Sequence, residues 1–534
     1  MWGWLSPGGL RGLQNRLGGA AEAALVGSTP IHSRQLRIEN GQLGIERILV
    51  GGDRRLVLAV TIALSVAAGL VVGAYVAILS PLYAVAGVVA VAAGLLMLRD
   101  TQWSLMAIIG LICLLPFGAL PFKIGFTPTF LDLALLALYF VWIVRIATGQ
   151  AGRFVGTALG LPLVIFLLLA CASFVAGLAH ASLSPYLLRH FVEILLSIAL
   201  FFVVVNCVRS RQQLQELVRV LILAGFAAAC IGVVLYFLPE GWSIRLLSAL
   251  GRVGYPTGAG VLRYIEDNPD LPQRAISTST DPNVLGSLLI LVTTLTTAQL
   301  FAHRPLLRRP LLAGMVLTDL VCLYLTYSRG SMLGLAVGVG VLALVRYRKL
   351  IPAMVGAAML LLLLPQTQTY VQHLIEGIQL QDLATLMRLG EYKDALILIG
   401  RHPWIGVGFA GTPESSLYIG VSNVYLLIAE EMGLIGLALF LLLLALFFVQ
   451  VRRAWPRVRE SRDCGLDAIL VGLVASVVGI LVGGLFDHYF FNLNFPHSVS
   501  IFWLYLGLAM VAVRLGTEPS LSEGRCAPTA AVHR

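Results

Sequence analysis

Charged residues are scarce in this sequence. Asp, Glu, Lys and Arg make up 12% of the 534 residues, whereas hydrophobic residues make up 58%. This balance argues against a soluble globular protein and is typical of an integral membrane protein. Lysine is rarest, because only Lys123, Lys349 and Lys393 contribute to the 37 basic residues. The choice of arginine over lysine at any one position therefore carries little information.

Several motifs of soluble enzymes are also missing. No Gly-rich phosphate loop follows a predicted strand, and no HExxH or paired CxxC occurs. We therefore expect no metal and no cofactor. Five of the seven cysteines lie inside apolar runs, where a thiol behaves as a small hydrophobe, and no disulfide spacing is seen. They are Cys113, Cys171, Cys207, Cys230 and Cys322. A net charge of +10 suggests nucleic acid only in a soluble protein, so we expect no nucleic-acid partner.

Apolar runs near the ~20 residues that a membrane helix needs recur from residue 56 onward. They predict an all-α, polytopic membrane domain over residues 56–514, with about 12 to 14 transmembrane helices. The predicted spans are 56–79, 81–98, 103–120, 130–147, 159–179, 190–208, 217–238, 283–302, 308–327, 331–346, 350–365, 422–450, 467–486 and 497–514.

Basic residues predict the orientation, because they concentrate in cytoplasmic connections. Residues 1–55 lack a long apolar run and carry many arginines, which indicates a basic cytoplasmic segment rather than a cleaved signal peptide. With this segment inside, every inner connection is basic. Residues 515–534 are rich in Pro, Ser, Ala and Gly and are predicted to be a disordered cytoplasmic tail. Two long polar loops, 239–282 and 366–421, are predicted to lie outside.

Arginines in these outer segments run against the usual orientation of charge. Arg274 lies in RAISTSTDPNVLG, and Arg388 lies in the second loop. Arg329, in TYSRGSMLG, lies between two apolar runs. Arg329 is either a loop residue that reaches the lipid headgroups or a phosphate clamp, since a guanidinium fits phosphate oxygens. A demand for anion binding is one explanation for these outer arginines.

The second loop and the apolar run after it hold further polar candidates. Residues 380–400 predict an amphipathic helix at the membrane surface, on which Arg388 and Glu391 are neighbours, either as a solvated face or as a site. HPWIGVGF follows, with glycines suited to tight backbone approach. In SNVYLLIAEEMG, Asn423 and Glu430 lie near one helix face, and Glu431 is rotated by roughly 80° from it. Carboxylates at a membrane boundary are costly without a role.

The final outer connection, FDHYFFNLNFPH, contains Asp487, His488, Asn494 and His497. An aromatic belt explains its Phe and Tyr residues, but not its Asp and His residues. Nucleoside triphosphates are absent from the outer side. An anionic substrate met there must arrive already activated, and a lipid-linked sugar pyrophosphate meets that requirement.

Four segments, in order, resemble the O-antigen ligase and polymerase superfamily of bacterial envelope polysaccharide assembly. They are RAISTSTDPNVLG, TYSRGSMLGLAVG, MRLGEYKDALILIGRHPWIGVGF and SNVYLLIAEEMGLIGLALF. The resemblance covers roughly residues 190–510. It implies a multi-pass protein of the bacterial plasma (inner) membrane. The implied activity is glycan transfer from an undecaprenyl pyrophosphate carrier to an acceptor glycan on the outer face. The implied partners are this lipid-linked glycan, membrane lipid and proteins of polysaccharide assembly.

The resemblance also implies roles for residues. Arg274, Arg329 and Arg388 are expected to hold the pyrophosphate and stabilise it as leaving group. Asn423 and Glu431 match the motif that opens the helix after the large loop. The family commonly has His before that Asn, where this chain has Ser422. His402, His488 and Glu431 are therefore the candidates for the catalytic base, and the alternative is a polymerase that needs no equivalent His.

Two other functions remain open at this stage. Some superfamily members are associated with bicarbonate uptake, so a transporter of a small anion or solute is the alternative, with the same arginines lining its path. A structural membrane scaffold fits the hydropathy but leaves the outer charged residues unexplained.

Overall fold

The structure, a computed structural model, describes residues 94–120, 123, 125–150, 152–363, 368, 372, 375, 379, 383–411, 420–460 and 464–517. All of these belong to one compact unit, Val91–Arg534. The predicted basic segment 1–55, the span 56–79, most of the span 81–98 and nearly all of the tail 515–534 lie outside the described residues.

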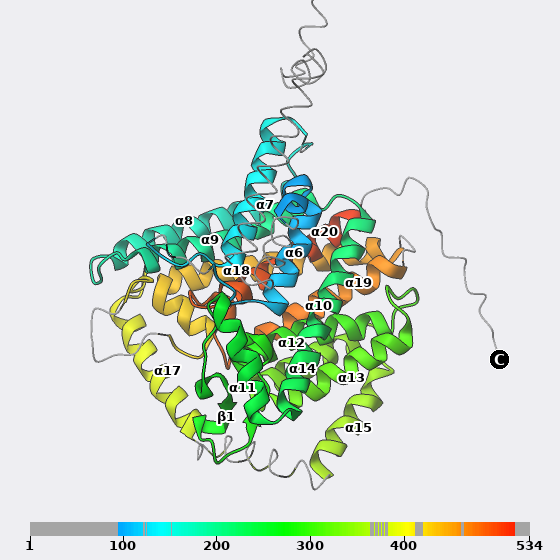
Figure 1. Cartoon of the computed structure of the whole chain (residues 1–534). Helices are drawn as coiled ribbons and strands as arrows, with labels where there is room; N and C mark the ends of the chain where they lie inside the picture. Colours follow the sequence, from blue (N-terminus) through cyan, green and yellow to red (C-terminus); the bar gives the residue numbers. More distant parts are fainter. Residues whose placement is uncertain are drawn as a thin grey trace, which may run out of the picture. The chain divides into compact units, whose positions relative to one another are not determined.

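Helices make up most of the described chain (Figure 1). They are α6 (Thr101–Leu114), α7 (Phe130–Ala147), α8 (Gly160–Gly177), α9 (Pro185–Cys207), α10 (Arg211–Phe237), α11 (Glu240–Ala249), α12 (Pro282–Leu300), α13 (Arg309–Leu325), α14 (Arg329–Val345), α15 (Leu350–Leu363), α17 (Leu383–Arg401), α18 (Val424–Glu460), α19 (Cys464–Gly483) and α20 (Pro496–Thr517). Short 3-10 turns are η1 (Leu250–Val253), η2 (Ala259–Val261), η3 (Ile265–Asp267), η4 (Ser277–Ser279) and η6 (Tyr489–Phe491).

The strands are short and lie in the first long loop. β1 (Arg263–Tyr264) pairs antiparallel with β2 (Gln273–Arg274), and Arg263 faces Arg274 in the register. This hairpin returns the chain to the start of α12 and fixes the position of Arg274.

The all-α, polytopic prediction is confirmed. Among the described residues, eight helices are long and apolar enough to cross a membrane: α7, α8, α9, α10, α12, α18, α19 and α20. The apolar helices α6, α14 and α15 are shorter. Each predicted span from 103–120 onward coincides with a helix, and the amphipathic segment 380–400 forms α17. The total of about 12 to 14 spans stays a prediction, because the first spans precede residue 94.

Local signals explain many of the helix starts. Thr129 and Asp132 form a capping box at α7, and Ser210 and Gln213 form one at α10. Asp281 caps α12, whose first residue is a proline, as favoured at that position. These caps satisfy backbone N–H groups that a helix leaves unpaired at its start.

Burial divides the helices into inner and outer ones. Almost every side chain of α20 is buried, and α12 and α19 are buried nearly throughout. By contrast, α7 and α8 expose large apolar side chains such as Phe140 and Leu168. Exposed apolar faces on this scale suit contact with lipid tails rather than water.

Glycines allow α14 to pack closely against α19. A Cβ at Gly334 would lie 2.8 Å from the carbonyl oxygen of Gly479, and one at Gly338 would lie 3.2 Å from that of Ala475. Gly334 and Gly338 are four residues apart in TYSRGSMLGLAVG, a spacing that lets membrane helices approach. The two glycines of this motif therefore serve helix packing, and they follow Arg329 in the same motif.

One predicted boundary is wrong. The run 422–450 was expected to end before a basic inner connection, but α18 continues to Glu460 and includes Arg452, Arg453, Arg457 and Arg459. Arginine is a good helix former, so the basic stretch extends the helix instead of ending it. The same helix is broken at Gly433, where φ is 72° and ψ is −179°.

Candidate functional site

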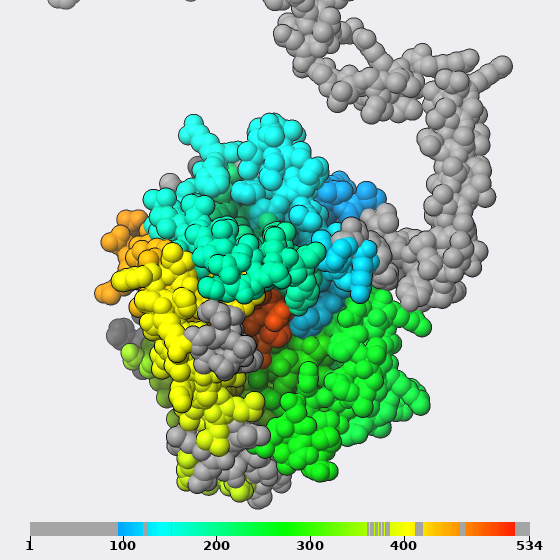
Figure 2. Space-filling model, turned by 90° about the vertical axis from the view of Figure 1, so that its left-hand side faces the viewer, coloured from blue at the N-terminus to red at the C-terminus, as the bar shows by residue number. Residues whose placement is uncertain are grey.

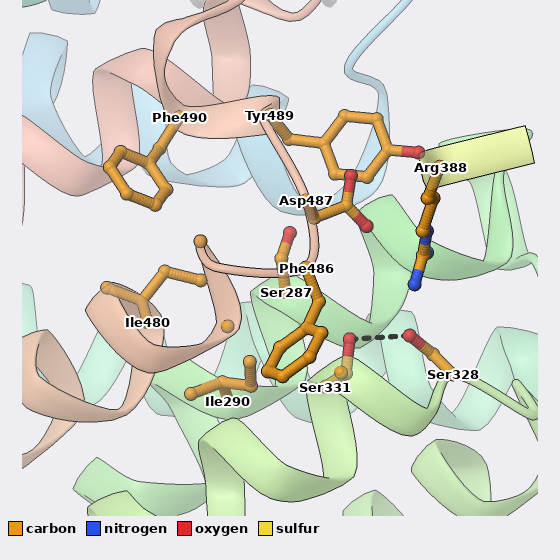
Figure 3. A pocket seen from close by; sticks show the side chains of 13 residues that line it. Ser287, Ile290, Ser328, Ser331, Arg388, Ile480, Phe486, Asp487, Tyr489 and Phe490 are labelled. Atoms are coloured by element: carbon orange, nitrogen blue, oxygen red, sulfur yellow. Dashed lines mark hydrogen bonds between the residues drawn. The ribbon is translucent and has the colours of Figure 1, made fainter. Parts of the chain in front are cut away.

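A small pocket brings together polar residues from four parts of the chain (Figure 3). Ser287 comes from α12, Ser328 immediately precedes α14, and Arg388 comes from α17. Asp487 and Tyr489 come from the connection between α19 and α20. The guanidinium of Arg388 points into the space between Asp487 and Ser328, whose hydroxyl lies 2.8 Å from that of Ser331.

Arg274 lies next to this pocket and is held by two hydrogen bonds. Its Nε donates to the Thr326 carbonyl at 2.8 Å, and a terminal nitrogen donates to Asn283 Oδ1 at 2.7 Å. Burial lowers the pKa of Arg274, whereas the nearby Asp281 raises it. The same electrostatic environment includes Arg388, so the two long loops bring these arginines together.

The motif RAISTSTDPN explains how Arg274 reaches the start of α12. Ser277 and Thr280 adopt positive φ values of 53° and 56°, which turn the chain sharply. Asp281 then accepts hydrogen bonds from the backbone N–H groups of Asn283 and Val284. Tyr489 donates its hydroxyl to the same Asp281 oxygen at 3.1 Å. The helix cap thus also anchors the connection that carries Asp487.

Asp487 sets the charge of the pocket. Burial raises the pKa of Asp487 to about 8, although Arg388 acts in the opposite direction. At neutral pH its carboxyl group is therefore largely protonated, and it neutralises little of the charge of Arg274 and Arg388. The pocket is suited to an anion.

The cavity in this pocket is small, about 20 Å³, which is enough for roughly one water molecule. A pyrophosphate is larger, so its binding requires the surrounding side chains to move apart. Arg388, on α17, is only half-buried, so its side chain is one that can move.

Arg329 faces a different space. Its side chain lines an apolar groove of about 600 Å³ formed by α12, α13, α14 and α15, with Leu320, Met332 and Met354 among its walls. Its neighbours Ser328 and Gly330 line the Arg388 pocket. Of the three predicted arginines, the structure brings Arg274 and Arg388 together and places Arg329 at the adjoining groove.

The loop HPWIGVGF closes the break in α18. Val407 donates its N–H to the Glu430 carbonyl at 2.8 Å, Gly408 donates to that of Glu431 at 3.0 Å, and Leu434 donates to Pro403 at 2.7 Å. The Ser173 hydroxyl of α8 also donates to the Glu431 carbonyl. The carbonyl groups freed by the broken helix are therefore satisfied, as burial in a membrane protein demands.

Glycines are required on both sides of this contact. Gly406 has φ of 74°, and a Cβ there would lie 2.5 Å from the Glu430 carbonyl oxygen. At Gly433 a Cβ would lie 2.2 Å from the Trp404 carbonyl oxygen. The HPWIGVGF loop and the AEEMG segment of α18 therefore pack directly against each other.

Asn423 and Glu391 hold the start of α18. Asn423 Oδ1 accepts from the N–H groups of Tyr425 and Leu426 at 3.0 and 3.1 Å, and its amide donates to the Leu485 carbonyl. Glu391 accepts from the Ser422 N–H at 2.9 Å. Asn423 is therefore a helix cap in this structure, and Glu391 contacts the protein instead of lying on a fully solvated face.

The three predicted base candidates lie in different surroundings. His402 follows α17, and its ring lies 6.1 Å from that of His180. His488 and Glu431 line one cavity of about 380 Å³, to which His402 does not contribute. Glu430, which directly precedes Glu431 in α18, is fully buried, and neither of its carboxylate oxygens has a hydrogen-bond partner among the described residues.

His488 also lies beside the position of Ser422. Its ring makes a hydrogen bond to the backbone of Val421, and its Nδ1 has no hydrogen-bond partner among the described residues. Since Nδ1 is unpartnered, Nε2 is the nitrogen that donates to the Val421 carbonyl. Burial lowers the pKa of His488, so the ring is neutral at neutral pH and Nδ1 carries a lone pair.

Sequence reasoning missed several residues around the site. Asp281, Ser287, Ser328 and Tyr489 were not singled out, because a helix cap, two small hydroxyls and one Tyr in an aromatic stretch carry no distinctive pattern. His497 was noted, but it is buried against Phe117, with ring centroids 4.9 Å apart. Among the described residues, no group of three or more His, Cys, Asp or Glu side chains could hold a metal ion.

Comparison with known proteins gives two matches. Residues 314–441 match the family described as O-antigen ligase. This segment contains Arg329, Arg388, Asn423 and Glu431, whereas Arg274 and His488 lie outside it. A second match is to a protein of Thiomonas intermedia (strain K12) described as a probable peptidoglycan glycosyltransferase FtsW, with 33% identity over 97 residues. That alignment covers 18% of this chain and 22% of the relative's length.

The two matches agree with a multi-pass membrane protein of the glycosyltransferase or ligase kind. The match of residues 314–441 to the O-antigen ligase family confirms the resemblance to the O-antigen ligase and polymerase superfamily.

Proposed function

We propose that this protein transfers a glycan from an undecaprenyl pyrophosphate-linked oligosaccharide to an acceptor glycan on the outer face of the bacterial plasma membrane, as a polymerase or a ligase. The observation that carries the proposal is the convergence of Arg274 and Arg388 beside the largely protonated Asp487. Two guanidinium groups beside a largely neutral carboxyl group stabilise a leaving pyrophosphate.

The donor's two chemical parts have matching surfaces. The arginine pocket suits the pyrophosphate, because one guanidinium group can donate two parallel hydrogen bonds to phosphate oxygens. The apolar groove of about 600 Å³ suits a polyprenyl chain, and Arg329 lines it next to residues of the arginine pocket. A single lipid-linked ligand can therefore use both spaces.

The reaction that we propose forms one bond and breaks one bond. A hydroxyl oxygen of the acceptor attacks the anomeric carbon of the donor glycan, and the bond from that carbon to the pyrophosphate oxygen breaks. The pyrophosphate oxygen keeps the electron pair, and Arg274 and Arg388 stabilise its charge. His488 Nδ1 takes the proton of the attacking hydroxyl, because this neutral ring nitrogen has no protein partner.

A gene deletion complemented with variants tests the proposal in cells. We expect the deletion to shorten or remove a surface polysaccharide, wild type to restore it, and Arg388→Ala to fail. Arg245→Ala is the matched control, since Arg245 is an exposed outer-loop arginine stacked on Trp242, away from the pocket. Normal polysaccharide in the deletion strain, together with lost uptake of a small anion, would reject glycan transfer in favour of transport.

A further inference from the structure

A second cavity adjoins the arginine pocket. The consecutive residues Asp487 and His488 line different cavities, Asp487 the arginine pocket and His488 the cavity of about 380 Å³. This volume lies in the range of about 300–1,000 Å³ that is usual for small-molecule sites. The space-filling view shows orange-red surface, from the chain beyond α18, in a hollow bordered by yellow, cyan and green segments (Figure 2).

Three segments build the walls of this second cavity. The broken helix α18 contributes Leu427 and Glu431, and the end of HPWIGVGF with the residues that follow it contributes Phe409 and Ala410. The connection before α20 contributes His488, Asn492, Asn494 and Phe495. Broken membrane helices commonly place their interruption at a ligand site.

Glu431 points to a ligand in this cavity. Its side chain lines the cavity, only 5% of the residue is exposed, and its Oε2 has no hydrogen-bond partner among the described residues. A buried polar atom without a partner costs about 1–3 kcal/mol, so such atoms usually have a ligand or water. Oε2 itself is closed to the cavity, so a ligand hydroxyl group donates to it only after the Glu431 side chain turns.

The other walls limit the chemistry of that ligand. The amides of Asn492 and Asn494 can both donate and accept hydrogen bonds, and the rings of Phe409 and Phe495 offer apolar faces. Among the described residues that line the cavity there is no arginine or lysine, so they offer a phosphate no cationic group. A neutral, hydroxyl-rich molecule with an apolar face satisfies all of these groups, and a sugar ring is such a molecule.

We infer that this second cavity is the binding site of the acceptor sugar, with Glu431, Asn492 and Asn494 as hydrogen-bonding groups. The inference rests on the proposed function and adds the location of its second substrate. A sugar held here has a hydroxyl next to His488, and His488 directly follows Asp487 of the pyrophosphate pocket. The two substrates thus meet at the connection between α19 and α20.

Transfer kinetics with separate titrations of donor and acceptor test the inference. The donor is the lipid-linked oligosaccharide extracted from the same strain, and the acceptor is the free oligosaccharide released from it by mild acid. Ala410→Trp fills the cavity without removing a polar group, and we expect the acceptor concentration at half-maximal rate to rise at least about tenfold. The donor concentration at half-maximal rate should stay unchanged.

A second variant and a control guard against loss of folding. Asn492→Asp keeps the oxygen that accepts from the Asn494 N–H at 2.8 Å and removes the amide donors, so it should also weaken only the acceptor. Ala259→Trp adds the same indole to an exposed residue of the first outer loop and should change neither titration. Wild-type acceptor dependence in both cavity variants would overturn the inference.

Direct binding separates failure of the inference from failure of the proposed function. Equilibrium dialysis of radiolabelled free oligosaccharide with purified protein measures the cavity without any reaction. Binding that Ala410→Trp abolishes and Ala259→Trp preserves supports the sugar site even if wild type transfers no glycan, which would reject only the proposed transfer. Transfer by wild type with oligosaccharide binding that survives in Ala410→Trp would reject only the site.

Discussion

At the scale of single residues, the proposal of His488 as proton acceptor depends on contacts between distant parts of the chain. Ser422 stands where the superfamily commonly has His, and sequence reasoning left His402, His488 and Glu431 as alternatives. The structure separates them, because the ring of His488 binds the Val421 backbone and His402 lies beside His180. Nothing in the local pattern of FDHYFF indicates that His488 lies next to residue 421.

Removal of His488 should therefore reduce glycan transfer strongly. His488→Gln keeps a hydrogen-bonding side chain but cannot take the proton, so we expect a loss of about 10²–10⁴ in rate. Ser422→Ala should be nearly silent, and Ser422→His should not be required for activity. The measurement is chain extension in membranes supplied with purified lipid-linked oligosaccharide. Loss in Ser422→Ala with full activity in His488→Gln would return proton handling to Ser422.

Donor binding should depend on pH through Asp487. The pKa of Asp487 is raised to about 8, so the carboxyl group is mostly neutral below this pH and becomes ionised above it. The ionised form pairs with Arg388 and competes with the pyrophosphate. The other titratable groups facing it are Arg274, Asp281, His488 and Tyr489.

We therefore expect the donor concentration at half-maximal rate to rise as pH increases through about 8. Asp487→Asn removes the titration and should flatten this dependence while keeping tight donor binding at neutral pH. The check is a series of donor titrations from pH 6.5 to pH 9.5. A rise of the same size in Asp487→Asn would contradict the role of this carboxyl group.

At the scale of elements, apolar runs predicted nearly every helix of the described chain, but not the break in α18. The run around residue 433 reads as one continuous span, since the two glutamates of AEEMGLIGLALF stand inside otherwise apolar sequence. The break exists because the HPWIGVGF loop supplies N–H groups to Glu430 and Glu431. A partner so far along the chain leaves no local signal except the glycines themselves.

Gly433→Ala should destabilise the protein. The backbone there, with φ of 72° and ψ of −179°, is a conformation that essentially only glycine adopts, and forcing another residue into it costs about 1–3 kcal/mol. The expected result is a lower melting temperature of the purified protein in detergent. Gly390→Ala is the control, because a Cβ at Gly390 in α17 meets nothing within 4 Å; it should be neutral or slightly stabilising.

At the scale of the whole molecule, composition and charge predicted a multi-pass helical protein, and the helices agree. The site depends on segments that the topology must place on one side, because Arg274 of the first long loop and Arg388 of the second meet beside Asp487. Sequence reasoning grouped Arg274, Arg329 and Arg388 by resemblance. It could not show that Arg329 lines the apolar groove and not the Arg388 pocket, since the surroundings of a residue at a helix start depend on tertiary packing.

Cysteine labelling tests the sidedness. In a background without native cysteines, we expect Gly390→Cys, exposed on α17, to react with a membrane-impermeant maleimide added outside. Arg457→Cys, exposed near the end of α18, should react only after the membrane is opened. Labelling of position 390 from the cytoplasmic side alone would overturn the arrangement.

The central claim is that Arg274 and Arg388 stabilise a pyrophosphate leaving group. Its most direct test is the rate at which purified protein in liposomes releases polyprenyl pyrophosphate from lipid-linked oligosaccharide after acceptor is added. We predict acceptor-dependent release by wild type and a loss of about 10²–10³ in Arg274→Ala and in Arg388→Ala. Replacement of either arginine by lysine should restore little of the release rate, because an ammonium group cannot make the two parallel hydrogen bonds of a guanidinium group. Release at the wild-type rate by the double variant Arg274→Ala with Arg388→Ala would contradict the claim.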